Sequence, residues 1–455
     1  MQPREVVTAE DARQIVEERG LAYVKLGIVD LDGVLRGKYV AAEKFFSGLK
    51  SGIGFCDVIL GWDVDDQAYD NVQMTGWHTG FPDASVRILP ESCRELPLEP
   101  GMLFFLCEFE GASEAICPRG ILRQVIERAK GMGYAPYASL EYEFFVFEET
   151  PNSVREKNYR NLKPMTPGSF GYSILRSTVH ADFYHALLDL CLQMDMPLEG
   201  LHTETGPGVL EGCITVDDAL AAADKAALFK TFAKALAQKH GLMATFMAKW
   251  SAQQAGQSGH IHLSLKDQAG NAAFYDPTQD RNMSEVMRHF IGGQQRLMPE
   301  LLGMVACTVN SYSRLVPGLW APTNATWGIE NRTCAIRAIP GSAKSQRVEY
   351  RVAASDANPY LALAAALGSG ILGVAHQMEP DAPMQGNAYE SKVAKERRLP
   401  ATLWDAAQAL KESDSARTLF GDAFVDHYSA SREWEERMFR KHVTDWELAR
   451  YFEII

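Results

Sequence analysis

The stretch that decides the fold class is residues 140–147, Leu-Glu-Tyr-Glu-Phe-Phe-Val-Phe. Its aromatic and β-branched residues are typical of a strand, yet two carboxylates interrupt it. In a strand, Glu141 and Glu143 point to the same face, roughly 6.5 Å apart. Two explanations stay open: each carboxylate binds a different metal ion, or the strand lies at a sheet edge and its acids face water.

Two more clusters follow this stretch in the chain. Gly206-Pro207-Gly208 is typical of a tight turn, and the hairpin that it predicts would bring Glu204 and Glu211 toward one site. A Gly/Ser loop then precedes a strand that places three polar side chains on one face. These are His260, His262 and Ser264. Surface turns are often acidic and single histidines are usually structural, so neither cluster alone distinguishes a site from a surface.

A cationic cluster lies nearer the C-terminus. Its members are Arg314, Arg332, Arg337, Lys344, Arg347 and Arg351, with Glu349 among them. Planar guanidinium groups near carboxylates suit a site for phosphate and carboxylate groups, although alternating charge also occurs on solvated edge strands. Oxygen-rich ligand sets with one imidazole suit Mg²⁺ or Mn²⁺. Residue types and spacing thus indicate a metal-dependent phosphoryl-transfer enzyme.

The rest of the chain predicts an α+β fold with two unequal domains. Residues 8–20 begin with a capping box and predict a helix, and residues 23–40 predict a β-hairpin. We expect a small β-rich domain over residues 1–105 and a large domain over residues 106–455, with a strand at 104–109 opening the second unit. The helices predicted in the large domain cover residues 118–130, 217–240 and 357–378, the last of them buried.

Composition and charge exclude several classes of protein. The 455 residues are 46% hydrophobic and 23% charged, which excludes collagen, coiled-coil and disordered chains. The net charge of −13 argues against nucleic acid as the main partner. The 8 cysteines show no C-x-x-C spacing, so we expect reduced, packed thiols in a cytoplasmic protein. The sequence predicts neither a signal peptide nor a membrane span.

The ordered motifs resemble the glutamine synthetase superfamily. In chain order they are E-x-E, E-x-G-P-G-x-x-E, G-H-x-H-x-S, R-L-V-P-G, N-R-T-x-x-I-R and K-x-x-R-x-E-x-R, and the resemblance covers nearly the whole chain. It implies an N-terminal β-grasp domain, a large catalytic domain, and a dodecamer of two hexameric rings with active sites between subunits. It also implies ATP, two or more Mg²⁺ or Mn²⁺ ions per site, and L-glutamate that is activated as γ-glutamyl phosphate.

The resemblance also implies a role for each site residue. The first metal ion would be bound by Glu143, Glu204 and Glu211, and the second by Glu141, His260 and Glu349. Glutamate would be held by Arg314, Arg351 and the backbone of Gly256, with Glu204 beside it. Phosphate and nucleotide contacts would come from Arg332, Arg337, Arg347, Glu199, His262, Ser264 and Lys344. All six metal-ligand positions are filled, which argues against a non-catalytic structural or regulatory member.

Two departures from the glutamine synthetase pattern concern the nitrogen nucleophile. Trp320 stands where a flap glutamate would help deprotonate ammonium. Phe55 falls where a neighbouring subunit would lend an aspartate, although Cys56 and Asp57 are close enough to leave that assignment open. Tryptophan attracts alkylammonium groups by cation–π contact, and Trp62 would extend the apolar wall. We therefore expect a γ-glutamylamine synthetase, with glutamine synthetase as the alternative; polyamine, ethanolamine, alkylamine and aromatic amine all stay open.

Overall fold

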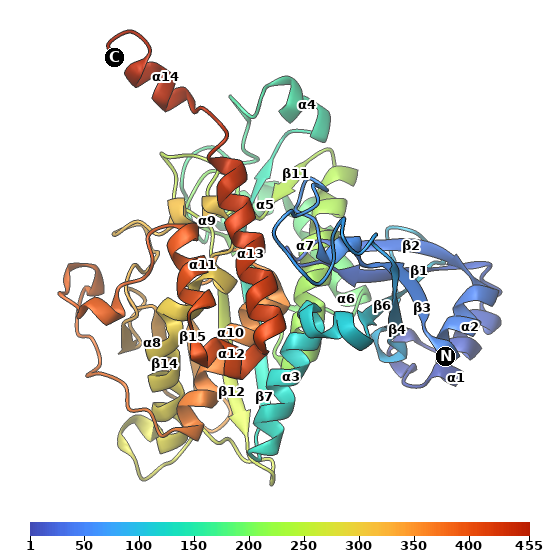
Figure 1. Cartoon of the computed structure of the whole chain (residues 1–455), viewed down its shortest axis with the longest axis horizontal. Coiled ribbons are helices and arrows are strands. Elements are labelled where there is room, and N and C mark those ends of the chain that lie inside the picture. The colour runs from blue at the N-terminus through green and yellow to red at the C-terminus, as the bar shows by residue number, and fades with distance from the viewer.

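In the computed structural model, which describes residues 1–455, the chain forms a small N-terminal part and a large C-terminal part, each built on its own sheet (Figure 1). Helices make up 42% and strands 20% of the chain, so the predicted α+β class is confirmed. None of the helices combines the length and the apolar character needed to cross a membrane.

The N-terminal sheet has six strands in the order β2-β1-β6-β4-β3, with β5 beside β6. The predicted hairpin is present, because β1 and β2 pair antiparallel along their whole length. Strand β6 runs parallel to β1 and antiparallel to β4. The elements are α1 (Ala9–Glu18), β1 (Tyr23–Val29), β2 (Leu35–Ala41), α2 (Ala42–Ser51), β3 (Ile53–Cys56), β4 (Asp83–Ile88), β5 (Arg94–Glu95) and β6 (Leu103–Phe109).

Strand β6 corrects one sequence-based prediction. The sequence assigned residues 104–109 to the second unit, but every strand that pairs with β6 belongs to the N-terminal sheet. A domain boundary at residue 105 would cut this strand, so we propose that the N-terminal domain extends through Phe109. The assignment failed because β6 pairs in parallel with a strand far away in sequence, a contact that local patterns do not encode.

The large sheet has nine strands in the order β13-β14-β15-β12-β7-β9-β8, and β10 and β11 both pair with β7. Residues 140–147 lie in β7, which has 13 residues and strands on both sides. The strands are β7 (Ala135–Phe147), β8 (Leu198–Thr203), β9 (Val209–Ile214), β10 (Asp217–Asp218), β11 (Met243–Thr245), β12 (Gly259–Lys266), β13 (Trp327–Ile329), β14 (Ile336–Ile339) and β15 (Arg347–Tyr350).

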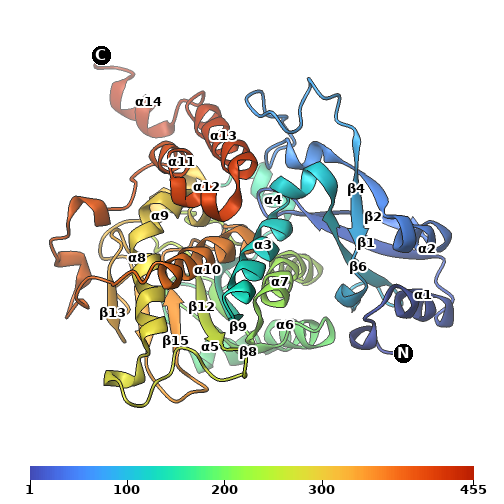
Figure 2. The ribbon, with the colours of Figure 1, turned by 60° about the horizontal axis from the view of Figure 1, so that its bottom comes forward.

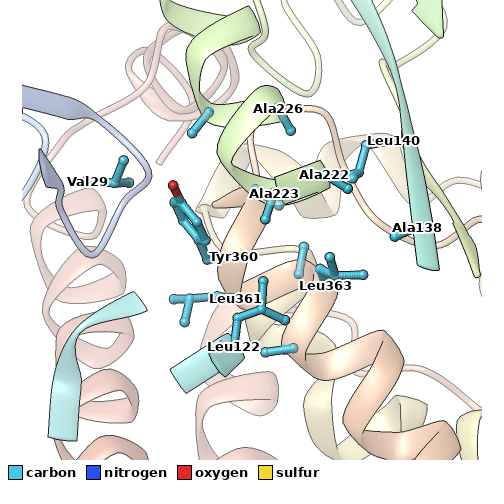
Figure 3. Packing of buried hydrophobic residues seen from close by; sticks show 14 of the residues in the cluster. Val29, Leu122, Ala138, Leu140, Ala222, Ala223, Ala226, Tyr360, Leu361 and Leu363 are labelled. Atoms are coloured by element: carbon cyan, nitrogen blue, oxygen red, sulfur yellow. The ribbon is translucent and has the colours of Figure 1, made fainter. Parts of the chain in front are cut away.

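Helices α3, α7 and α10 cover one face of the large sheet (Figure 2). Leu122 of α3, Ala222 of α7 and Leu361 of α10 share one hydrophobic core with Leu140 of β7 (Figure 3). The helices of this part are α3 (Pro118–Gly131), α4 (Pro151–Glu156), α5 (Ile174–Val179), α6 (Ala181–Gln193), α7 (Ala219–Lys239), α8 (Glu285–Val305), α9 (Val309–Arg314), α10 (Pro359–Ala375), α11 (Leu403–Lys411), α12 (Asp414–Phe420), α13 (Asp422–Phe439) and α14 (Asp445–Tyr451). Because strand residues alternate between faces, Leu140 in the core puts Glu141 on the opposite face.

Local signals in the sequence predicted several of these elements. The capping box between Thr8 and Asp11 begins α1, and Pro118 occupies the first turn of α3. Asp218 caps α7 by accepting hydrogen bonds from two backbone N–H groups. Helix α10 is buried from Pro359 to Gly373, as its uncharged sequence predicted.

Helix α13 joins the two parts of the chain. Arg432 donates from Nη2 to Asp32 Oδ1 at 2.7 Å, and Trp434 donates from Nε1 to Asp63 Oδ2 at 3.0 Å. Beyond α13, helix α14 and the C-terminus extend away from the body of the molecule (Figures 1 and 2). The exposed apolar side chains of this tail include Trp446, Phe452, Ile454 and Ile455.

Candidate active site

Strand register brings the predicted acids and histidines together. Glu141 of β7 lies opposite His260 of β12, and Glu143 lies opposite Glu211 of β9. Glu349 of β15 lies opposite His262. His262 is two residues after His260 in β12, so the two histidines share one face of the sheet. Directly paired residues of neighbouring strands point to the same face, so four strands direct these side chains to one side of the sheet. Because β7 is a central strand, the explanation of residues 140–147 as an edge strand is wrong.

One half of the site consists of Glu141, His260 and Glu349. His260 Nδ1 lies 3.6 Å from Glu141 Oε2 and 3.6 Å from Glu349 Oε1, and ligand atoms of all three lie within 4.8 Å of one another. Burial opposes ionisation of Glu141, but its contacts with the imidazoles of His260 and His262 outweigh burial and lower the pKa. Burial likewise opposes ionisation of Glu349, whose pKa is nevertheless lowered to about 2 by His260 and Arg351.

The other half consists of Glu143, Glu204 and Glu211. Glu143 Oε2 accepts a hydrogen bond of 2.6 Å from the backbone N–H of Ser258. Glu211 Oε1 lies 3.7 Å from His202 Nε2. Burial, followed by repulsion from the neighbouring glutamates, raises the pKa of Glu211 to about 9. In this half, three carboxylates therefore lie close together, and the protein places little positive charge beside them to offset their repulsion.

These two halves fit divalent cations. Oε2 of Glu204 and Nε2 of His260 are buried without a hydrogen-bond partner. Buried polar atoms are almost always satisfied in native proteins, so two unpaired atoms among clustered carboxylates fit a site that a cation completes. Carboxylate oxygens with one imidazole form the kind of set that Mg²⁺ or Mn²⁺ accepts.

Arg314 is held firmly by the protein. The residue is 1% exposed, and its guanidinium donates to Val352 O at 2.8 Å, Ser258 Oγ at 2.8 Å and Arg351 O at 3.1 Å. Gly256 packs against it, since a Cβ at Gly256 would fall 2.5 Å from Arg314 Cγ. Burial lowers the pKa of Arg314 to about 10. The structure thus brings Gly256 and Arg314 together, but both terminal nitrogens of Arg314 bond to protein groups.

Two arginines contact the buried Glu349 carboxylate. Arg351 pairs with it through Nη1, and the buried Nε of Arg351 has no hydrogen-bond partner. Arg337 donates from Nη1 to Glu349 Oε2 at 3.2 Å and from Nε to Glu330 Oε2 at 2.9 Å. Arg337 is therefore fixed in place, whereas the guanidinium of Arg351 keeps a buried donor, Nε, without a partner.

A pocket of about 250 Å³ adjoins Glu141. On its wall, Arg347 Nε donates to His262 Nδ1 at 3.2 Å. Arg332 is exposed and does not line this pocket. The residues predicted for the nucleotide side that line this pocket are Glu199, His262, Ser264, Lys344 and Arg347.

The residues predicted to select the amine are not gathered at this pocket within one chain. Trp320 lies in the turn after α9, is 57% exposed and has a φ of 59°. The rings of Phe55 and Trp62 lie in the N-terminal part, with their centroids 4.6 Å and 4.9 Å from cationic groups of β2. None of the three lines the pocket beside Glu141.

Three residues at the site were not predicted from the sequence. The ring of Tyr172 stands edge-on to His202 with centroids 4.4 Å apart. Ser258 supplies the N–H group that binds Glu143, and its position directly before the predicted His260 strand was an available signal. Cys213 lies opposite Glu141 in the β7–β9 pair, two residues after Glu211 and so on the same face.

Comparisons with known proteins agree with this geometry. Residues 115–451 match the catalytic domain of glutamine synthetase. The chain is 43% identical over 439 residues to type-1 glutamine synthetase 2 of Dictyostelium discoideum, covering 95% of this chain and 84% of that protein. It is 37% identical to the glutamate–isopropylamine ligase of a Pseudomonas species, covering 97% of each. The solved structure of GmaS without ligand superposes with a TM-score of 0.84 at 27% identity, covering 97% of this chain and 99% of GmaS. This chain belongs to the glutamine synthetase family.

Proposed function

We propose that this protein joins the γ-carboxylate of L-glutamate to an organic primary amine with ATP, through a γ-glutamyl phosphate. The observation that carries the proposal is Trp320, because residues 315–322 present an exposed tryptophan and no acid beside a complete set of metal-ligand positions. An indole face attracts alkylammonium groups through cation–π and apolar contact. The Pseudomonas relative, named for isopropylamine, supports the same class of nucleophile.

The glutamine synthetase family depends on ATP and divalent metal ions. We assign one ion to Glu143, Glu204 and Glu211, and a second to Glu141, His260 and Glu349, with Mg²⁺ or Mn²⁺ as the ions. The unpaired buried atoms of Glu204 and His260 support this assignment. When bound, such ions neutralise the charge that develops on the transferred phosphoryl group.

We assign the pocket beside Glu141 to ATP. Lys344 and Arg347 on its wall supply positive charge for the phosphates. Arg337, held by Glu330 and Glu349, presents a guanidinium that needs no reorganisation when negative charge develops. Arg332 is exposed and is available to contact the phosphoryl group during transfer.

Arg351 and Arg314 are assigned to the carboxylate of glutamate. Arg351 is supported by its buried Nε, which has no partner within the chain. Arg314 holds the backbone carbonyls of residues 351 and 352, so it also fixes the position of Arg351. Gly256 leaves room beside this pair because any side chain there would clash with Arg314. A planar fork of donors suits bidentate binding of a carboxylate.

Phe55 and Trp62 are assigned to the amine pocket of a neighbouring subunit. Neither lines the pocket beside Glu141 in its own chain, and the exposed apolar tail offers a surface for self-association. In that tail Ile454 is 81% and Ile455 is 93% exposed. We propose a dodecamer of two hexameric rings, which sedimentation velocity measures directly.

Phosphate release from ATP in the presence of glutamate tests the proposed activity. The reaction is run with ammonium, ethanolamine, isopropylamine, aniline, putrescine and spermine in turn, and mass spectrometry identifies each γ-glutamyl product. We expect one of the organic amines to give the highest kcat/KM. No metal-dependent phosphate release with any nucleophile would instead indicate a non-catalytic protein.

Glutamine synthetase is the second candidate function. The relative from Dictyostelium, which is 43% identical to this chain, carries that name. If ammonium gives the highest kcat/KM in the panel, this candidate replaces the amine ligase. The metal and ATP assignments stand in either case, because both reactions pass through γ-glutamyl phosphate.

A further inference from the structure

A tyrosine that follows α10 in the chain lies beside the residues assigned to glutamate. Tyr389 is the middle residue of the 3₁₀ helix Ala388–Glu390, and the first N–H of that helix donates to Thr333 Oγ1 at 2.9 Å. Two residues after Thr333, the carbonyl of Ala335 accepts a hydrogen bond of 2.8 Å from the N–H of Arg351. One short stretch of the chain therefore contacts both the helix that carries Tyr389 and the backbone of Arg351.

Hydrogen bonds fix the position of this short helix. Asn331 Nδ2 donates to Gly386 O at 2.9 Å, and Asn387 Oδ1 accepts a hydrogen bond of 3.1 Å from the N–H of Tyr389. Asn331 belongs to the N-R-T motif, so the segment that carries Tyr389 is attached directly to the turn that contains Arg332. A side chain on a fixed segment loses less conformational entropy when it binds a ligand.

The hydroxyl group of Tyr389 is buried without a hydrogen-bond partner. Burial raises its pKa, and the positive charges of Arg351 and Arg314, which lie near enough to act on the phenol, oppose this rise. The phenol therefore keeps its proton at neutral pH and is available as a donor. Nε of Arg351 is a second buried donor in the same state, and the two groups do not bond to each other.

Tyr184 of α6 carries an unpaired hydroxyl in an apolar setting. Its hydroxyl is also buried without a partner, and the residue packs in the hydrophobic core. Burial alone raises its pKa to about 12, with no contribution from a charged group. The feature that distinguishes Tyr389 is thus its position near two arginines rather than the missing partner.

We propose that the hydroxyl of Tyr389 donates a hydrogen bond to the same glutamate carboxylate that Arg351 binds. A carboxylate has two oxygens and accepts several hydrogen bonds, so one such group satisfies both unpaired donors. Unsatisfied buried donors cost free energy, and this cost is removed when the substrate binds. The inference rests on the proposed function for the identity of the acid, and it adds a binding residue outside the motifs that identified the site.

The substitution Tyr389→Phe removes the hydroxyl and keeps the ring. Isothermal titration calorimetry of the full-length protein with L-glutamate, in the presence of Mg²⁺ and ADP, should show a dissociation constant raised by about ten- to a hundredfold, the loss expected for a hydrogen bond to a charged group. The dissociation constant of ADP should not change. A purely structural role of the hydroxyl would instead lower the Tm of the free protein and leave the affinity for glutamate unchanged.

Tyr184→Phe is the matched control. It makes the same chemical change at a hydroxyl that is also buried and unpaired, so glutamate should bind this variant as it binds the wild type. If Tyr389→Phe does not fold, Tyr389→Leu replaces it, because leucine also removes the hydroxyl. Circular dichroism and gel filtration check that each variant folds and assembles.

Two results overturn the proposal and leave the proposed function intact. They are wild-type affinity for glutamate in Tyr389→Phe, and an equal loss of affinity in Tyr184→Phe. Affinities for ADP and glutamate that fall together in Tyr389→Phe also overturn it, because they indicate a general defect. If the wild-type protein does not bind glutamate, both this inference and the proposed substrate are wrong. The titration contains no nucleophile, so the choice between an organic amine and ammonium does not alter its interpretation.

Discussion

Glu349 connects the proposed metal site to two buried arginines, so its replacement should change both stability and activity. The carboxylate is 2% exposed, lies 3.6 Å from His260 Nδ1, and accepts hydrogen bonds from Arg337 and Arg351. Glu349→Ala leaves these cationic groups without their shared partner, and breaking a buried pair costs about 3–5 kcal/mol. Because Arg337 keeps Glu330 as a partner, we expect a loss near the lower end, about 3 kcal/mol, in urea unfolding.

Glu349→Gln separates the two effects. The amide keeps the shape of the side chain and one acceptor oxygen, so its cost in unfolding free energy should be smaller than that of alanine. Both variants lose a charged ligand, so phosphate release at saturating Mg²⁺ should fall by about 100-fold or more. The control is Glu379→Gln, an exposed acid that faces Arg288 and His289 and should keep wild-type turnover. Wild-type turnover in Glu349→Gln would refute the metal assignment, and an unchanged stability of Glu349→Ala would refute the buried pairing.

Four further substitutions probe separate assignments. Arg351→Lys keeps the charge but loses the planar fork, so steady-state kinetics should show a glutamate KM raised about ten- to hundredfold, equivalent to about 1.5–3 kcal/mol, with little change in the KM for ATP. Lys344→Met should instead raise the KM for ATP, and an equal rise for both substrates would indicate a defect in assembly. Gly256→Ala forces a contact with Arg314 and should cost about 1–3 kcal/mol, seen as a lower Tm; an unchanged Tm would contradict the close packing. Trp320→Glu should lower kcat/KM for the preferred amine by the equivalent of about 0.5–2 kcal/mol and raise the relative use of ammonium, and an unchanged ratio would remove Trp320 from the amine pocket.

The sequence predicted elements whose signals are local. Capping residues located the start of α1, Pro118 located the start of α3, and uncharged residues identified the buried helix α10. The same holds for the acids of residues 140–147, because a period of two fixes which strand residues share a face. The prediction that these acids and His260 form one site rested on the order of several motifs along the chain, because no single motif indicated it.

The failures concern contacts between segments far apart in sequence. Nothing near residues 104–109 indicates a parallel pairing with β1, so that strand was placed in the wrong unit. The register that sets Cys213 opposite Glu141 is likewise a property of the folded sheet. Arg314 was predicted from its motif, but its bonds to backbone carbonyls depend on how α9 meets the end of β15. Such contacts arise from tertiary packing, which short sequence motifs do not encode.

The most direct test of the account is a competition between nucleophiles. The wild-type protein is given ATP, glutamate, Mg²⁺ and equal concentrations of ammonium and the best amine of the panel, and mass spectrometry measures the two products at early times. Their ratio equals the ratio of the two kcat/KM values, so it needs no separate kinetic analysis. The account predicts that the γ-glutamyl amide of the organic amine exceeds glutamine, because Trp320 offers the amine an apolar face and residues 315–322 offer ammonium no acid. An excess of glutamine would contradict it.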